Sequence, residues 1–133
     1  MGNVKIINAV LCEDIRHEIN NKNSLIGVFS GDVLISELPG KVRFAIYYEA
    51  SVEMPGKIKS EIRLQYADKA AFTAELEHDV QTKYISSATP PFELVIENEG
   101  DFVVSVRFEE QDWKEIIRRR ISLDARIATS AST

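Results

Sequence analysis

The sequence predicts an all-β fold, an antiparallel β-sandwich of about eight strands. Three observations indicate it: apolar residues recur with a period of two along most of the chain, turn residues separate these runs, and no internal repeat is present. Short strands spaced by turns are typical of two packed sheets. Cys12 is the only cysteine, so the paired cysteines of immunoglobulin domains are absent. The topology, immunoglobulin-like or jelly-roll-like, therefore stays open.

Two segments in the amino-terminal part are apolar on both sides of the pleat. They span residues 4–11 and 25–35, and such strands are expected to have both faces covered. Gly27 and Gly31 predict bulges or a close backbone approach within the second segment. The polar residues 20–24 predict the turn that joins the two.

The middle of the chain gives the clearest alternation. Every even position from 42 to 54 is apolar, whereas the odd positions include arginine and glutamate. Pro55 and Gly56 then supply turn chemistry, since proline presets φ and glycine tolerates positive φ. Residues 57–66 alternate again between charged and apolar side chains. We therefore expect a β-hairpin that reverses at Pro55 and Gly56.

The second half predicts another hairpin and two segments of ambiguous period. Residues 92–96 and 102–108 alternate on either side of the turn at 98–101, so we expect these two strands to pair. Residues 72–80 and 113–123 satisfy both the strand and the helix template. We favour a strand for each of them.

A single domain is expected to span residues 1–127. A chain of 133 residues has the common size of one domain and buries roughly two thirds of its unfolded surface, so neither a metal nor a disulfide is needed to hold it together. No cofactor is predicted. Residues 128–133 are small and polar. They are expected to form a flexible tail, because the contacts of such side chains do not offset the conformational entropy lost on ordering.

The composition points to a soluble protein of the cytoplasm. Hydrophobic residues make up 44% of the chain and charged residues 28%, and no apolar run is long enough to cross a bilayer. The amino terminus lacks the pattern of a secretory signal, so a bacterial cytoplasm is the expected location. The net charge of −5 disfavours binding to phosphate backbones. We expect neither a nucleic acid nor a membrane as partner.

The sequence CEDIRHE at residues 12–18 is the densest group of reactive side chains. A metal site there would use Cys12, Glu13, Asp14 and His17. Their spacing matches neither CxxC nor HExxH, which argues against zinc. In an extended strand His17 points away from Cys12, so the two cannot form a nucleophile and its base. We interpret Cys12 as a small buried residue at a strand end, and we predict no catalytic residue.

Other candidate groups also favour structural roles. His78 continues the apolar face of residues 72–80, a position typical of a histidine with a hydrogen-bond partner inside the fold. The arginines at 118–120 alternate between two faces and have acidic neighbours in sequence, which favours a solvated face over nucleic-acid recognition. Trp113 and the other aromatic residues are expected in the core or in cross-strand pairs.

Two motifs resemble those of a bacterial family of small domains of unknown function. The first is LCEDIRHE at residues 11–18, which contains a Cys-acid-Asp-Ile-Arg segment, and the second is NSLIGVFSGD at residues 23–32, which contains Ser-Leu-Ile-Gly-Val-Phe. The sequence FELVIENEGDFVVSVRF at residues 92–108 is similar to the closing strands of that family. The resemblance implies a small β-sandwich and brings no activity, cofactor or catalytic residue with it.

The resemblance also joins CEDIRHE and the strand at Leu25 into one unit. Its polar side chains form a candidate structural corner or, as a second reading, a ligand site: Asp14, Arg16, Glu18 and Asp32.

Two hypotheses of function follow from this reading. The leading one is a non-catalytic β-sandwich module that acts through protein–protein interaction or self-association. The alternative is a small enzyme or ligand-binding domain with a polar pocket near Asp14, Arg16 and Asp32. An exposed apolar patch or a bare sheet edge favours the module, whereas a deep pocket at those residues favours the alternative.

Overall fold

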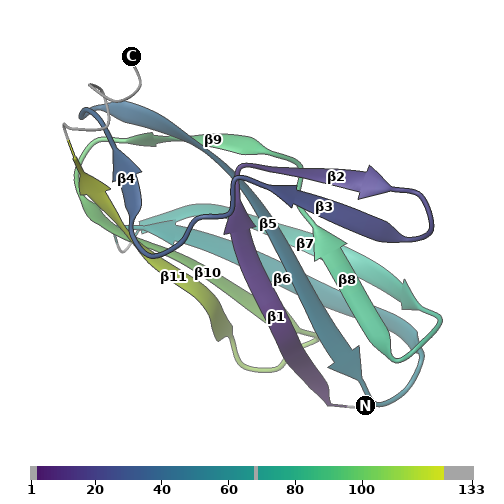
Figure 1. Ribbon diagram of the computed structural model, residues 1–133. Coiled ribbons are helices and arrows are strands. Elements are labelled where there is room, and N and C mark those ends of the chain that lie inside the picture. The colour runs from purple at the N-terminus through teal and green to yellow at the C-terminus, as the bar shows by residue number, and fades with distance from the viewer. Residues whose placement is uncertain (1–2, 68, 125–133) are drawn as a thin grey trace.

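The computed structural model describes residues 3–67 and 69–124, and this part of the chain forms eleven strands and no helix (Figure 1). The strands are β1 (Val4–Cys12), β2 (Asp14–Glu18), β3 (Lys22–Ile26), β4 (Val33–Ile35), β5 (Gly40–Val52), β6 (Gly56–Tyr66), β7 (Lys69–Val80), β8 (Tyr84–Ala88), β9 (Phe92–Ile96), β10 (Gly100–Phe108) and β11 (Lys114–Leu123). The predicted all-β sandwich is confirmed, with eleven strands instead of about eight. Within the described ranges, no helix could cross a membrane.

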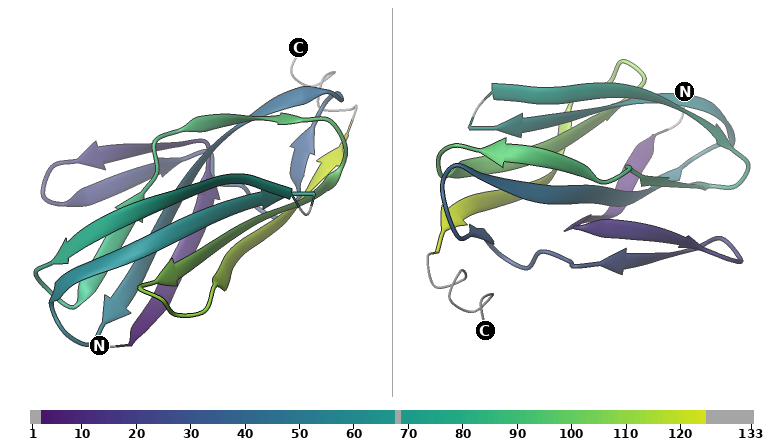
Figure 2. Two further views of the ribbon diagram at one scale, coloured as in Figure 1. Left: turned by 180° about the vertical axis from the view of Figure 1, so that it is seen from behind. Right: turned by 90° about the horizontal axis from the view of Figure 1, so that it is seen from above.

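Two sheets face each other, and a separate hairpin lies against one of them (Figures 1 and 2). In the first sheet β5 is central, with β1 on one side and both β8 and β9 on the other. The second sheet has the order β4-β11-β10-β6-β7, and its pairs are antiparallel except for β4 with β11. The β2–β3 hairpin lies on the side of the first sheet that faces away from the second (Figure 2).

The core between the sheets is centred on Phe44 of β5. Its ring stacks on Phe102 of β10, with centroids 4.6 Å apart and an interplanar angle of 11°. Phe29 and Phe92 add tilted contacts at 5.5 and 6.0 Å. Phe44 and Phe102 are both fully buried. Because one ring comes from each sheet, this stack holds the two layers together.

Both predicted hairpins are wrong in their pairing. The chain does turn after β5, but β6 belongs to the second sheet, so this connection crosses between the layers. In the same way β9 pairs with β5, whereas β10 pairs with β6 and β11. A period of two shows which face of a strand is buried and does not show its neighbour. The hairpins formed by consecutive strands are β2–β3, β6–β7 and β10–β11.

The two ambiguous segments are strands, as predicted: residues 72–80 lie in β7 and residues 113–123 supply β11. By contrast, residues 25–35 do not form one strand. A loop with positive φ at Gly27 and Gly31 separates β3 from β4. The apolar run is explained by Phe29 in that loop, which packs against the core.

The segment 4–11 is strand β1, but its two faces are not both covered. Its inner face is buried, whereas Ile7 on the outer face is 49% exposed. The hairpin covers only the end of β1 nearest Cys12, so the remaining outer face meets solvent. The predicted tail, residues 128–133, and the predicted domain boundary at 127 lie outside the described residues.

We predict that Phe44→Ala lowers the free energy of unfolding by about 3–5 kcal/mol, because it removes a fully buried ring from the contact between the sheets. Urea denaturation measures the loss. Tyr84→Ala is the matched control, since this aromatic side chain is 65% exposed and its removal is expected to cost little. Equal losses for the two variants would contradict the assignment of Phe44 as the central core residue.

Candidate functional site

The CEDIRHE segment marks the point where the chain leaves the first sheet. Cys12 ends β1 with 0% exposure, and its Sγ lies 3.4 Å from the carbonyl oxygen of Asp14 and 3.5 Å from that of Ala45. Burial raises the pKa of the Cys12 thiol above its ordinary value. The predicted burial of Cys12 is therefore confirmed, and a raised pKa is the opposite of what a thiolate nucleophile needs.

The turn from β1 into β2 is fastened by backbone contacts of Glu13. Its N–H donates to the carbonyl oxygens of Ile26 at 3.0 Å and Gly27 at 3.1 Å, and its own carbonyl accepts from Nε of Arg43 at 3.3 Å. Gly27 has φ of +68°, and a Cβ at this position would collide with the Glu13 carboxylate. The turn thus favours glycine at 27 because of its positive φ, whereas the exposed Glu13 side chain is able to move away from a Cβ.

The four residues of the predicted polar corner are not assembled into one cluster. Asp14, Arg16 and Glu18 alternate on one face of β2, where Asp14 accepts from the N–H of its neighbour at 2.9 Å and Glu18 accepts from Ser24 at 3.2 Å. Asp32 instead accepts a hydrogen bond from Ser122 of β11 at 3.2 Å.

This arrangement offers no obvious pocket for a polar ligand. Three cavities of the described chain are lined by residues other than Asp14, Arg16, Glu18 and Asp32. Across residues 3–67 and 69–124, no three His, Cys, Asp or Glu side chains converge in a way that could hold a metal ion.

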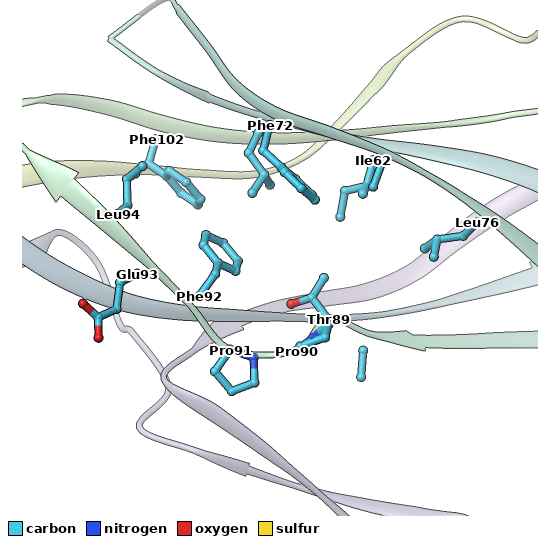
Figure 3. Close-up of a pocket in the computed structure, with 13 residues that line it drawn as sticks. Ile62, Phe72, Leu76, Thr89, Pro90, Pro91, Phe92, Glu93, Leu94 and Phe102 are labelled. Carbon is cyan, nitrogen blue, oxygen red and sulfur yellow. The ribbon is translucent and has the colours of Figure 1, made fainter.

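An apolar cleft of about 430 Å³ opens between the two sheets (Figure 3). Its lining residues come from β6, β7, β8, β9, β10 and the β8–β9 connection: Ile62, Leu64, Phe72, Ala74, Leu76, Ala88, Thr89, Pro90, Pro91, Phe92, Glu93, Leu94 and Phe102. Glu93 is the one charged residue among them, and its carboxylate is turned away from the aromatic rings (Figure 3). The size and apolar lining are typical of a binding site.

The cleft exists because the sandwich is not closed along this side. β7 ends the second sheet, and β8 and β9 end the first, so the edges of the two sheets lie near each other without pairing (Figure 1). Phe72, Ala74 and Leu76 of β7 face the gap. Phe72 remains 52% exposed although it points toward the core side of its strand. A large apolar surface thus stays open to solvent.

β7 also provides the longest uninterrupted sheet edge in the described structure. Native proteins blunt edge strands by shortness, bulges or prolines. β4 has only three residues, β1 has a register shift between Ile6 and Asn8, and Pro90 and Pro91 interrupt the edge formed by β8 and β9. From Phe72 to Val80, β7 pairs regularly with β6 on one side, contains no proline, and leaves its other side without a strand partner in the described chain.

His78 of β7 and Ser60 of β6 lie one step beyond the cleft at diagonal positions, since His78 pairs with Ile58 and Ser60 pairs with Leu76. Ser60 Oγ is 2.9 Å from Nε2 of His78, so His78 has the hydrogen-bond partner that the sequence predicted. Burial lowers the pKa of His78 and keeps the imidazole neutral. Ser60 is only 2% exposed, which prevents it from meeting a substrate as a nucleophile.

Two other groups that suggested ligand binding are engaged with neighbouring side chains. Arg118 binds Asp101 at 2.8 Å and a second carboxylate at 2.7 Å on an exposed face. The Trp113 ring is covered by the guanidinium groups of Arg63 and Arg107 at 4.3 and 4.9 Å. Arg118 and the Trp113 ring are therefore both engaged by neighbouring side chains.

Comparison of the chain with models of known protein families found no match, and comparison with curated proteins found none either. The resemblance carried by the two motifs stays a prediction. Function is therefore inferred from the cleft and from the strand edge beside it.

Sequence reasoning missed the cleft, although two signals for it are present. Residues 72–76 alternate apolar with polar side chains, which marks a half-buried strand, and Pro90-Pro91 marks an interrupted edge. The two segments come together only because β6–β7 and β8–β9 belong to different sheets. The prediction that consecutive strands pair as hairpins therefore does not place these two segments side by side.

The placement of the corner residues predicts unequal costs for two alanine variants. Asp14→Ala removes an acceptor from a backbone N–H and should lower the free energy of unfolding by about 1 kcal/mol. Arg16 is exposed, so Arg16→Ala should change it by no more than about 0.5 kcal/mol. Urea unfolding of both variants beside the parent measures this, and a larger loss for Arg16→Ala would contradict its exposed placement.

His78 predicts a loss of stability in mild acid. The folded chain holds the pKa of His78 below the ordinary 6.5, so the unfolded chain binds the proton more readily. Stability is therefore full above about pH 6.5 and falls as the pH decreases from there toward the lowered pKa. His78→Asn retains hydrogen-bonding groups and does not titrate. Urea unfolding at a series of pH values should show this fall in the parent and a smaller one in the variant, and identical profiles would contradict the prediction.

Proposed function

We propose that the protein is a binding module that receives an extended segment of a partner polypeptide along β7. One observation carries this proposal: the unprotected edge of β7 lies directly beside an apolar cleft, and the same strand forms both features. The proposal includes the cytoplasmic location expected from the sequence, with which the free thiol of Cys12 is compatible.

The edge of β7 supplies the backbone part of recognition. An added strand can accept and donate hydrogen bonds along the side of β7 that β6 leaves unpaired, which is the mode of recognition called β-augmentation. Each such bond contributes a net of about 0.5–1.5 kcal/mol. These contacts are made with any sequence, so they provide affinity more than selectivity.

The cleft supplies the side-chain part. Alternate side chains of an added strand point to the same face, and they repeat at about 6.6–6.8 Å along the strand. Phe72, Ala74 and Leu76 have this same spacing along β7, so apolar side chains of the partner would enter the cleft opposite them. Burial of one valine or leucine side chain contributes about 1.5–3 kcal/mol. The exposed ring of Phe72 would be covered at the same time.

The alternative function, a polar ligand site near Asp14, Arg16 and Asp32, has less support. Asp32 engages Ser122, and the three cavities described above lie elsewhere in the described chain. A bare strand edge and an exposed apolar surface are the features that favour a protein-binding module.

We predict that a blocked synthetic peptide of about nine residues, alternating threonine with valine or leucine, binds at this cleft. Ala74→Trp should weaken binding at least about tenfold, because the indole fills the space that the peptide side chains need. Thr73→Trp is the matched control, since the neighbouring residue points away from the cleft and its variant should bind as the parent does. Titration followed by amide NMR shifts measures affinity and places the contact on β7.

Three outcomes would contradict the proposal. The first is a peptide that fails to bind the parent chain, and the second is equal weakening by both tryptophan variants. Binding of a small apolar dye that Ala74→Trp abolishes, with no peptide binding, would assign the cleft to a small ligand and also overturn the proposal. Circular dichroism of each variant verifies that the fold is retained.

A further inference from the structure

We infer that the partner segment is basic, with lysine or arginine alternating with apolar residues, and that the acidic outer face of β7 selects it. This inference rests on the proposed function and adds the chemistry of the partner. The cleft accounts for one face of the bound strand, and the charges beside it determine what the other face must carry.

The outer face of β7 presents a row of carboxylates. Between the cleft-lining residues, β7 exposes Glu75, Glu77 and Asp79. A hollow of about 570 Å³ beside this row is lined by five glutamates, one lysine, one serine and one leucine, namely Glu61, Glu75, Glu77, Glu109, Glu110, Lys59, Ser60 and Leu76. The surface next to the free edge is therefore strongly acidic.

None of the three carboxylates in this row takes part in an ion pair within the described structure. Lys57 and Lys59 of β6 stand opposite Asp79 and Glu77, yet neither pair approaches within ion-pair distance. Glu75 stands opposite Glu61, whose own carboxylate is bound by Arg107 at 2.7 Å. Glu75 and Glu77 thus remain available to a cation on an added strand.

The register of an added strand fixes where its charges belong. Positions opposite Phe72, Ala74 and Leu76 face the apolar cleft, so the alternate positions face outward and stand opposite Thr73, Glu75 and Glu77. Opposite charges in such cross-strand pairs stabilise, and each pair is expected to change affinity by about 1.4- to 5-fold. A segment of alternating apolar and basic residues satisfies both faces at once.

The same charges disfavour a second copy of this chain as the occupant. Two antiparallel copies of β7 that pair about Leu76 would place Glu75 of one copy opposite Glu77 of the other, because outward positions stand opposite outward positions. Like charges at these positions are destabilising. The chain's net charge of −5 adds repulsion between copies and attraction toward a basic partner. Both the like charges on β7 and the net charge of the chain therefore oppose self-association through this edge.

The test uses three peptides that share the same apolar residues and carry lysine, threonine or glutamate at the alternate positions. We expect the lysine peptide to bind the parent chain about tenfold more tightly than the glutamate peptide, with the threonine peptide between them. The difference should shrink as salt is added, because the pairs are exposed to solvent. Isothermal titration at two salt concentrations measures both effects.

A charge reversal separates local pairing from net charge. Glu75→Lys combined with Glu77→Lys should reverse the order and favour the glutamate peptide. The matched control combines Glu37→Lys with Glu97→Lys, two exposed carboxylates outside the cleft lining, and makes the same change in net charge. This control should retain the preference for lysine, at reduced strength.

The outcomes distinguish the inference from the function on which it rests. Equal binding of the three peptides would overturn the basic partner while leaving the strand-binding function intact. Binding of none of them would overturn the proposed function itself. Equal shifts in the two charge-reversal variants would show that net charge alone is responsible, and this result would also overturn selection by Glu75 and Glu77.

Discussion

The stack of Phe44 on Phe102 is the contact on which the rest of the structure depends. It ties the centre of the first sheet to the second, and it stands at the inner wall of the cleft through Phe102. Because the two layers are joined in their interior, the sandwich can remain open where β7 meets the β8–β9 edge. The binding surface is therefore a consequence of how the core is built, since a rigid interior allows one edge to stay unpaired without loss of the fold.

Most of the secondary structure was predictable, because alternation along β5, β6 and β10 is set by which side chains the core buries. Pairing was not predictable from the same signal. β5 and β6 have matching patterns because they face the same core from opposite sheets. The alternation of side chains therefore does not show whether two strands are neighbours in one sheet or lie in different sheets. Phe29 contributed to the wrong prediction of one strand over residues 25–35 for a related reason. It is a loop residue that packs against the core, and in the sequence such a residue is indistinguishable from part of an apolar strand.

Features of the candidate sites that depend on neighbouring residues were predictable, whereas features that depend on long-range contacts were not. The burial of Cys12 follows from local apolar neighbours, and the partner of His78 follows from its place on an alternating face. The relation of Asp14 to Asp32 depends on where β4 and β11 meet, and that parallel pair joins segments far apart in the chain. The cleft needs the same kind of long-range knowledge, because its two walls come from different sheets.

An exposed apolar edge carries a cost that the charges of β7 help to offset. A bare strand beside an open cleft is a hazard for aggregation, because any apolar strand can pair with it. Glu75 and Glu77 raise the energy of pairing with a copy of the same strand, and they do so without filling the cleft. Selectivity and solubility then have one origin: the carboxylates that repel a second β7 are the ones that a basic strand would neutralise.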